Sequence, residues 1–249
     1  MSFFTVEERE RIQSHILDLA RADERVVAGA IVGSRANGGG DRWSDLDLTF
    51  GLADGVRPVD VLDDWTRDLR ESFRPAHLFD LPFRAILYRV FLFPGNLQVD
   101  VSCAPAAQWG AHSPKFELLF GAATQQPHVS PPDEREVFGY AAHHLVRARI
   151  SIERGRLLEA EYLLREARDQ ALALACLRAE LPALHGRGLD RLPAEPRSRA
   201  EETLVREISA LELLRALGAT VEMLLSVARA DQVGELEADL RGLTAPLAP

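Results

Sequence analysis

The two halves of this chain carry different hydrophobic patterns, and this change limits the folds that the sequence can adopt. Before residue 105, short apolar and β-branched runs that suit buried strands alternate with two helical patterns. From residue 134 onward, apolar residues recur only at helical spacing and lie among good helix formers. We therefore expect an α+β protein, in which a mixed-sheet domain precedes an all-α helical bundle.

A stretch rich in proline and small polar residues, 121–133, lies between the two halves and predicts a linker. Domains are accordingly expected at 1–125 and 134–249. The N-terminal half should contain helices at 6–22 and from Pro58 onward, and strands at 26–32, 45–51, 76–81, 85–93 and 97–103. The C-terminal half should contain helices at 134–154, 156–181, about 198–217 and 219–241, with Gly155 as a break and a further boundary near Ser209.

Composition restricts the partners that this chain can have. The 249 residues carry a formal net charge of −9, which argues against a long polyanion such as nucleic acid as the main partner. No apolar run reaches the length of a membrane span, and the first ten residues lack the apolar core of a signal peptide. The two cysteines, Cys103 and Cys176, provide neither a zinc spacing nor a disulfide framework. These features predict a cytoplasmic protein that has no membrane partner.

Three features in the first half bear on chemistry. The predicted strand 26–32 runs into Gly33 and Ser34, where a turn of small residues can bring backbone N–H groups close to phosphate oxygens. Asp45 and Asp47 follow at a spacing of two, so on a strand they point to the same face. Asp100 lies within an alternating strand, on the face opposite its apolar neighbours. Carboxylates that share a face favour a divalent cation.

These residues, in this order, resemble the nucleotidyltransferase core of the DNA polymerase β superfamily. The resemblance implies that Gly33 and Ser34 bind the β- and γ-phosphates of a nucleoside triphosphate. It implies that Asp45, Asp47 and Asp100 are the catalytic carboxylates, that they hold two Mg²⁺ ions, and that Asp100 accepts the proton of the attacking hydroxyl. Two metal ions held in this way suit in-line transfer at phosphorus. ATP is the expected co-substrate, with other triphosphates left open.

A finer resemblance concerns the antibiotic nucleotidyltransferases of the lincosamide type. It rests on the segments 21–26 and 153–158, and those enzymes pair this core with a C-terminal helical domain. The resemblance implies transfer of AMP to a hydroxyl of a small molecule, such as a lincosamide or an aminoglycoside, and release of pyrophosphate. The acidic charge would suit a cationic acceptor. The helical domain is expected to bind substrate or to form a homodimer.

Two alternatives to this interpretation remain open. The chain could be the nucleotidyltransferase half of a toxin–antitoxin pair that acts on or binds a protein partner, although its fused helical region argues against that. An RNA-tailing polymerase is disfavoured by the acidic charge.

Several other residues are candidates with simpler interpretations. Lys115 is interpreted as a solvated lysine, and His143 and His144 as positions on a helix surface. On the predicted helix 156–181, Glu161, Arg165 and Asp169 follow i, i+4 spacing and predict a solvated ladder of ion pairs. The functional alternative is a polar wall in which Glu166, Arg168 and Asp169 bind substrate.

Overall fold

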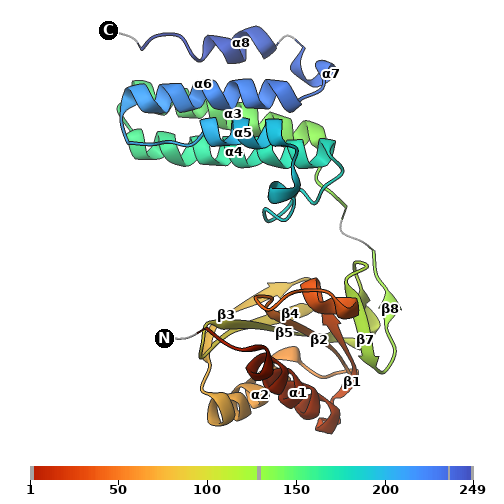
Figure 1. The fold of residues 1–249 in the computed structure, drawn as a ribbon. Helices are drawn as coiled ribbons and strands as arrows, with labels where there is room; N and C mark the ends of the chain where they lie inside the picture. The colour runs from red at the N-terminus through yellow and green to blue at the C-terminus, as the bar shows by residue number, and fades with distance from the viewer. Residues whose placement is uncertain (1–2, 128–129, 235, 248–249) are drawn as a thin grey trace. The chain divides into compact units, whose positions relative to one another are not determined.

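The structure is a computed structural model that describes residues 3–127, 130–234 and 236–247. Its chain folds into two units, Met1–Val129 and Ser130–Pro249, each with its own apolar core (Figure 1). The first unit contains a mixed sheet and the second is helical, which confirms the α+β class.

A six-stranded sheet forms the centre of the first unit, with strand order β3-β4-β5-β2-β1-β7. Strands β2 and β5 run parallel, whereas the other neighbouring pairs are antiparallel. The parallel pair lies in the middle of the sheet, so both of its strands have neighbours on each side. The strands are β1 (Val26–Val32), β2 (Leu46–Leu52), β3 (Ala76–Phe83), β4 (Ile86–Phe93), β5 (Leu97–Pro105) and β7 (Phe116–Phe120).

Two helices, α1 (Val6–Ala22) and α2 (Pro58–Phe73), cover one face of this sheet (Figure 1). The α1 helix begins with the expected capping box, in which Thr5 and Glu8 satisfy each other's backbone N–H groups. Apolar side chains of α1 and α2 pack with Phe50 and Val101 of the central strands in one buried cluster. Burial of this face provides the main stabilisation of the unit.

Part of the opposite face is covered by Trp109, which follows the short η2 helix (Ala106–Gln108). The Trp109 ring lies against the backbone of Gly51, and its Nε1–H donates to Thr49 Oγ1 at 2.9 Å. The strand directly after it, β6 (Gly110–Ala111), pairs with β8 (Thr124–Gln125). The tryptophan therefore closes one end of this face.

Three long helices build the core of the second unit: α3 (Glu134–Glu153), α4 (Leu157–Arg178) and α6 (Ala210–Val227). Gly155 separates α3 from α4 with a φ of 67°, as expected for a residue that reverses the chain. The shorter elements are η3 (Leu189–Arg191), α5 (Ala194–Glu202), α7 (Ala230–Val233) and α8 (Leu236–Gly242).

Some expected boundaries are wrong. The predicted linker 121–133 contains β8, and β7 was not anticipated, although it is a full member of the sheet. The helices expected at 198–217 and 219–241 are replaced by α5, α6, α7 and α8, because Ser209 caps α6 and Gly218 lies inside that helix. A glycine inside a helix costs about 1 kcal/mol relative to alanine, and the buried apolar face of α6 offsets this cost.

Candidate active site

The two central strands bring two of the candidate carboxylates together. Asp47 on β2 pairs in register with Asp100 on β5. Paired residues on neighbouring strands direct their side chains to the same face, about 4.8 Å apart in the plane of the sheet. Neighbours of Asp100 on β5, Val99 and Val101, are buried on the opposite face beneath α1 and α2. The two carboxylates thus lie on the face that the helices leave open.

The third candidate, Asp45, comes directly before β2 and lies near enough to act on Asp100. Burial is the main cause that raises the pKa of Asp100 above its ordinary value. The hydrogen bond from Gln98 Nε2, at 3.1 Å, opposes this rise, and the negative charge of Asp45 adds to it. Asp45 and Asp100 therefore lie within reach of each other's charge.

The turn after β1 packs directly on Asp47. Gly33 adopts a φ of 74°, and a Cβ atom at this position would overlap Asp47 Oδ2. Only glycine meets both conditions without strain. Ser34, the next residue, is exposed at the start of the short η1 helix (Gly33–Gly38). The structure therefore places the predicted phosphate-binding residues beside the predicted metal-binding residues.

Arg9 on α1 holds the loop that leads into Asp45, and this residue was not anticipated from the sequence. Its Nη1 donates to the carbonyl oxygens of Asp41, Arg42 and Ser44 at 2.9, 3.3 and 2.8 Å. The residue is only 5% exposed, so these carbonyl oxygens take the place of water around its guanidinium group. Arg9 thus fixes the path of the backbone immediately before the carboxylates.

The loop is also fixed from within and from β7. Ser44 Oγ accepts from the backbone N–H of Asp41 at 2.8 Å. Asn37, at a φ of 59°, donates its backbone N–H to Glu117 Oε2 at 2.7 Å and its side-chain amide to the Pro114 carbonyl at 3.1 Å. The glycine-rich segment 38–40 is therefore bounded by anchored residues on both sides.

The row that contains the carboxylates continues across the sheet with apolar residues. Val90 on β4 pairs with Asp100, and Phe79 on β3 pairs with Val90. The adjacent row places Tyr88 beside Ser102, and burial, with a smaller contribution from the charge of Asp47, raises the pKa of Tyr88. Four exposed side chains form an apolar patch beside these rows: Phe79, Leu81, Phe83 and Leu92. On β3 the patch residues occupy alternate positions, and this spacing was the available sequence signal, but it does not reveal which face of the sheet is open.

The carboxylates of this site suit a hard divalent cation, although they do not form a complete set of ligands in this structure. Within the described residues, no group of three or more His, Cys, Asp or Glu side chains comes close enough together to hold a metal ion. Mg²⁺ is usually held by one or two carboxylates together with water and substrate phosphates, rather than by a full protein cage. Asp47 and Asp100, with Asp45 nearby, meet that requirement.

The remaining candidates do not join this row. The backbone N–H of Lys115 donates to Ser113 Oγ at 3.2 Å in the segment before β7. His143 and His144 lie on α3 in the other unit, and burial lowers the pKa of His144. The predicted ion-pair ladder on α4 is wrong in its partners, because Arg165 pairs with Glu166 at 3.1 Å.

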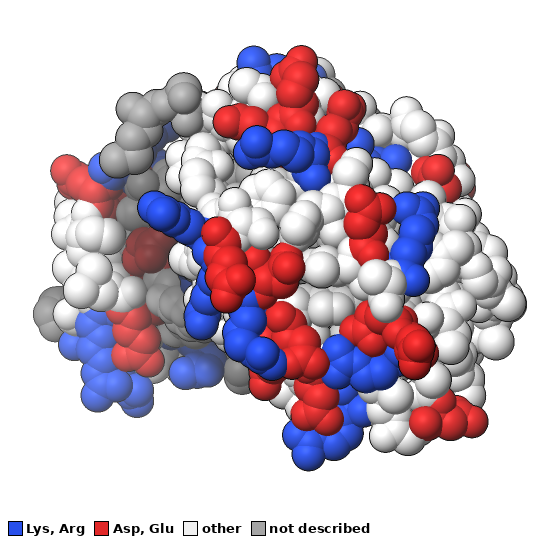
Figure 2. Space-filling model, turned by 90° about the horizontal axis from the view of Figure 1, so that it is seen from below, with Lys and Arg blue, Asp and Glu red and all other residues white. Residues whose placement is uncertain are grey.

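Surface charge is mixed on the face of the molecule that Figure 2 presents. Figure 2 shows acidic and basic side chains interleaved on the face that it presents, and among the described residues in that view neither sign forms an extended stripe. Of the helices described above, none combines the length and the apolar character that crossing a bilayer requires.

Comparison with known proteins gives a limited result. No protein-family model matches this chain, and no curated protein matches its sequence. A solved structure described as an aminoglycoside 6-adenyltransferase from Bacillus subtilis is similar over 96% of this chain and 98% of its own, with 12% sequence identity and a TM-score of 0.41. A likeness at this level does not establish a shared fold. The case for a function therefore rests on the residues and geometry of this chain.

Proposed function

We propose that this chain is a nucleotidyltransferase that transfers AMP from ATP to a hydroxyl of a small molecule. The observation that supports this most is the in-register pair of Asp47 and Asp100, with the Gly33 turn packed on Asp47. Acidic residues on neighbouring strands beside a small-residue turn provide what phosphoryl transfer needs from a protein, namely positioning and neutralisation of charge.

In the proposed reaction, the acceptor oxygen forms a bond to the α-phosphorus while the bond from that phosphorus to the bridging oxygen breaks. Pyrophosphate leaves, and the hydroxyl proton moves to Asp100. Gly33 and Ser34 would lie beside the leaving phosphates, where the backbone N–H groups of this turn would donate to phosphate oxygens. Mg²⁺ would be held by Asp47 and Asp100, with Asp45 nearby, and would neutralise phosphate charge when bound.

The apolar patch supports a particular kind of acceptor. An acceptor hydroxyl near Asp100 would have its neighbouring atoms over Val90 and Phe79, because these residues continue the same row. An acceptor that combines a hydroxyl with an apolar portion therefore suits this face better than a wholly polar one. Together with the sequence resemblance, this favours an antibiotic such as a lincosamide as the first compound to test.

The test is a panel of lincosamides and aminoglycosides, incubated with Mg²⁺ and each nucleoside triphosphate, with the acceptor's mass as the readout. We expect an acceptor to gain the mass of one nucleoside monophosphate as pyrophosphate is released. Asp47→Asn and Asp100→Asn should each slow this transfer on the order of 10²-fold or more, because each removes a charge from the reacting site.

The matched control is Asp60→Asn, which removes an exposed carboxylate on α2 and should leave turnover unchanged. Thermal unfolding of each variant would show whether the fold is retained. Wild-type turnover in both Asp47→Asn and Asp100→Asn would contradict the proposed site. No product with any acceptor or triphosphate, from a folded protein, would contradict the proposed activity on this class of acceptor.

A further inference from the structure

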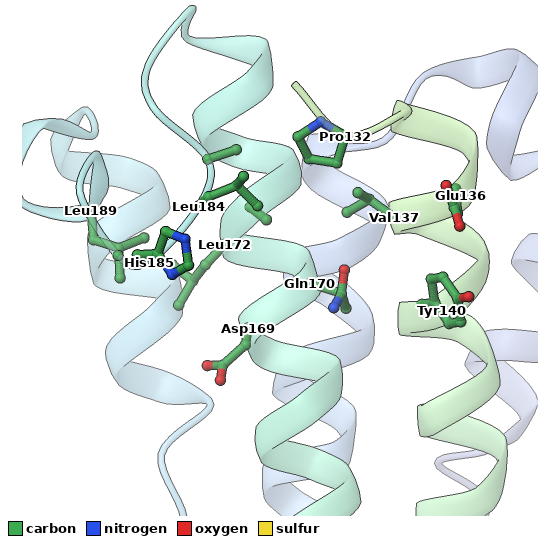
Figure 3. A pocket seen from close by; sticks show the side chains of 13 residues that line it. Pro132, Glu136, Val137, Tyr140, Asp169, Gln170, Leu172, Leu184, His185 and Leu189 are labelled. Carbon is green, nitrogen blue, oxygen red and sulfur yellow. The ribbon is translucent and has the colours of Figure 1, made fainter. Parts of the chain in front are cut away.

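The helical unit contains a groove with a volume of about 600 Å³. It lies between α3, α4 and the loop that follows α4 (Figure 3). In that view, Asp169 and Gln170 of α4 lie between Glu136 and Tyr140 of α3 on one side and His185 on the other. A groove of this volume lies in the range that small organic ligands occupy.

The walls of the groove are formed before any ligand binds. The loop after α4 is held by the hydrogen bond from the Leu181 N–H to the Cys176 carbonyl, at 2.8 Å. Its residues Ala183 and Leu189 pack on a small buried cluster that contains Cys176 and Leu192. On the other side, the α3 and α4 helices are joined by the main core of the unit. A ligand would therefore meet a fixed surface and would not have to order a mobile one.

The lining combines an apolar floor with negative charge. Val137, Leu172 and Leu184 provide apolar surface, and no lysine or arginine is among the residues that line the groove. Glu136 makes no ion pair with any described residue, and Asp169 is only 3.9 Å from Arg168 Nε, at the outer limit of an ion pair. Both carboxylates therefore keep most of their capacity to attract a cation.

We propose that this groove binds a small organic cation that has an apolar body, such as an amine with an aromatic ring. The body would lie on the apolar floor, and the negative charges of Glu136 and Asp169 would attract the ammonium group. An anion of the same size would be repelled by Glu136 and Asp169. The inference concerns the helical unit alone and does not depend on the proposed transfer reaction.

The test compares three ligands of nearly equal size on the full chain by isothermal titration calorimetry: phenethylamine, phenethyl alcohol and phenylacetate. We expect the amine to bind about tenfold more tightly than the alcohol, and the acid to bind more weakly than either, because only the amine is attracted by the carboxylates. Equal binding of amine and alcohol would overturn the proposal.

Variants then locate the site. Asp169→Asn and Glu136→Gln should each weaken binding of the amine and leave binding of the alcohol unchanged, whereas Leu184→Ser should weaken both. Glu159→Gln removes a carboxylate from the same helix α4 outside the groove, and it should change neither. Circular dichroism would verify that the variants fold. The assignment would be refuted if both carboxylate variants bound the amine with wild-type affinity. It would also be refuted if Asp47→Asn, a change on the sheet of the first unit, abolished binding of the amine.

Discussion

The carboxylate of Asp47 occupies the space beside Gly33 that a Cβ atom at position 33 would require. This contact joins the turn after β1 to the start of β2, so the turn and the acidic pair form one structure. Glycine is needed at this position for two separate reasons. One is the contact with Asp47, and the other is the positive φ of 74°, which by itself would disfavour another residue.

Replacing Gly33 separates these two reasons. Gly33→Ala should lower the free energy of unfolding by about 1–3 kcal/mol through backbone strain, and should also displace the Asp47 carboxylate. Gly38 has nearly the same φ, 73°, but nothing lies within 4 Å of its Cβ position, so Gly38→Ala tests strain alone. Urea unfolding and transfer activity of the two variants would be compared. Equal losses of activity would show that contact with Asp47 is unimportant.

Arg9 should hold the loop that leads into Asp45. Arg9→Met leaves the carbonyls of Asp41, Arg42 and Ser44 without their shared donor. We expect a loss of about 2–3 kcal/mol in unfolding free energy, because hydrogen bonds to charged groups lie in this range. The loop before Asp45 should also become more susceptible to limited proteolysis.

The control for Arg9 is Arg21→Met, which changes an exposed arginine on the same helix. It should leave both stability and the rate of proteolysis near the wild-type values. Unchanged proteolysis of the Arg9 variant would show that other contacts are sufficient to hold the loop.

The central strands were predictable because their patterns are strong and local. Val26–Val32 is an apolar run that ends at a glycine, and Asp100 interrupts an alternating strand. The pairing of Asp47 with Asp100 was expected only through the family resemblance, since register depends on strands that are distant in sequence.

Other features could not be predicted for specific physical reasons. Arginine at position 9 of an amphipathic helix is ordinarily solvated, and only the returning loop, more than thirty residues later, buries it. Strand β7 is short and only partly buried, so its pattern is weak. The interior glycine of α6 looked like a helix boundary because packing, not intrinsic propensity, determines that helix.

Acidification should destabilise the first unit through Asp23. The hydrogen bonds from Arg25, at 2.7 and 2.8 Å, hold the pKa of Asp23 below its ordinary value of 3.8. Because the folded-state pKa is depressed, the stability from this pair is present above the ordinary pKa and is lost as pH falls through the folded-state value. Unfolding free energies measured from neutral pH to below pH 3.8 should show this loss.

Asp23→Asn should be less stable at neutral pH and should lose less stability on acidification. Asn can still accept the hydrogen bond from Trp65 Nε1, so the variant removes mainly the charge. The exposed Asp18 on α1 is the control, because Asp18→Asn should leave the pH dependence unchanged. If the stability of Asp23→Asn decreased on acidification as steeply as that of the wild type, the acid sensitivity would have to come from other carboxylates.

The apolar patch should affect the acceptor more than the nucleotide. Phe79 continues the row of Asp47 and Asp100 but lies two strands from Asp100, too far to act on the phosphates. On the proposed function, Phe79→Ser should raise the KM for the acceptor severalfold, with little change in kcat or in the KM for ATP, because it removes apolar contact that is equal in ground and transition states. Leu118 is similarly exposed at the opposite edge of the sheet, so Leu118→Ser is the matched control and should change none of these constants. If the two substitutions had the same effect on the acceptor KM, the acceptor would have to bind elsewhere on the chain, because only Phe79 shares a row with the carboxylates.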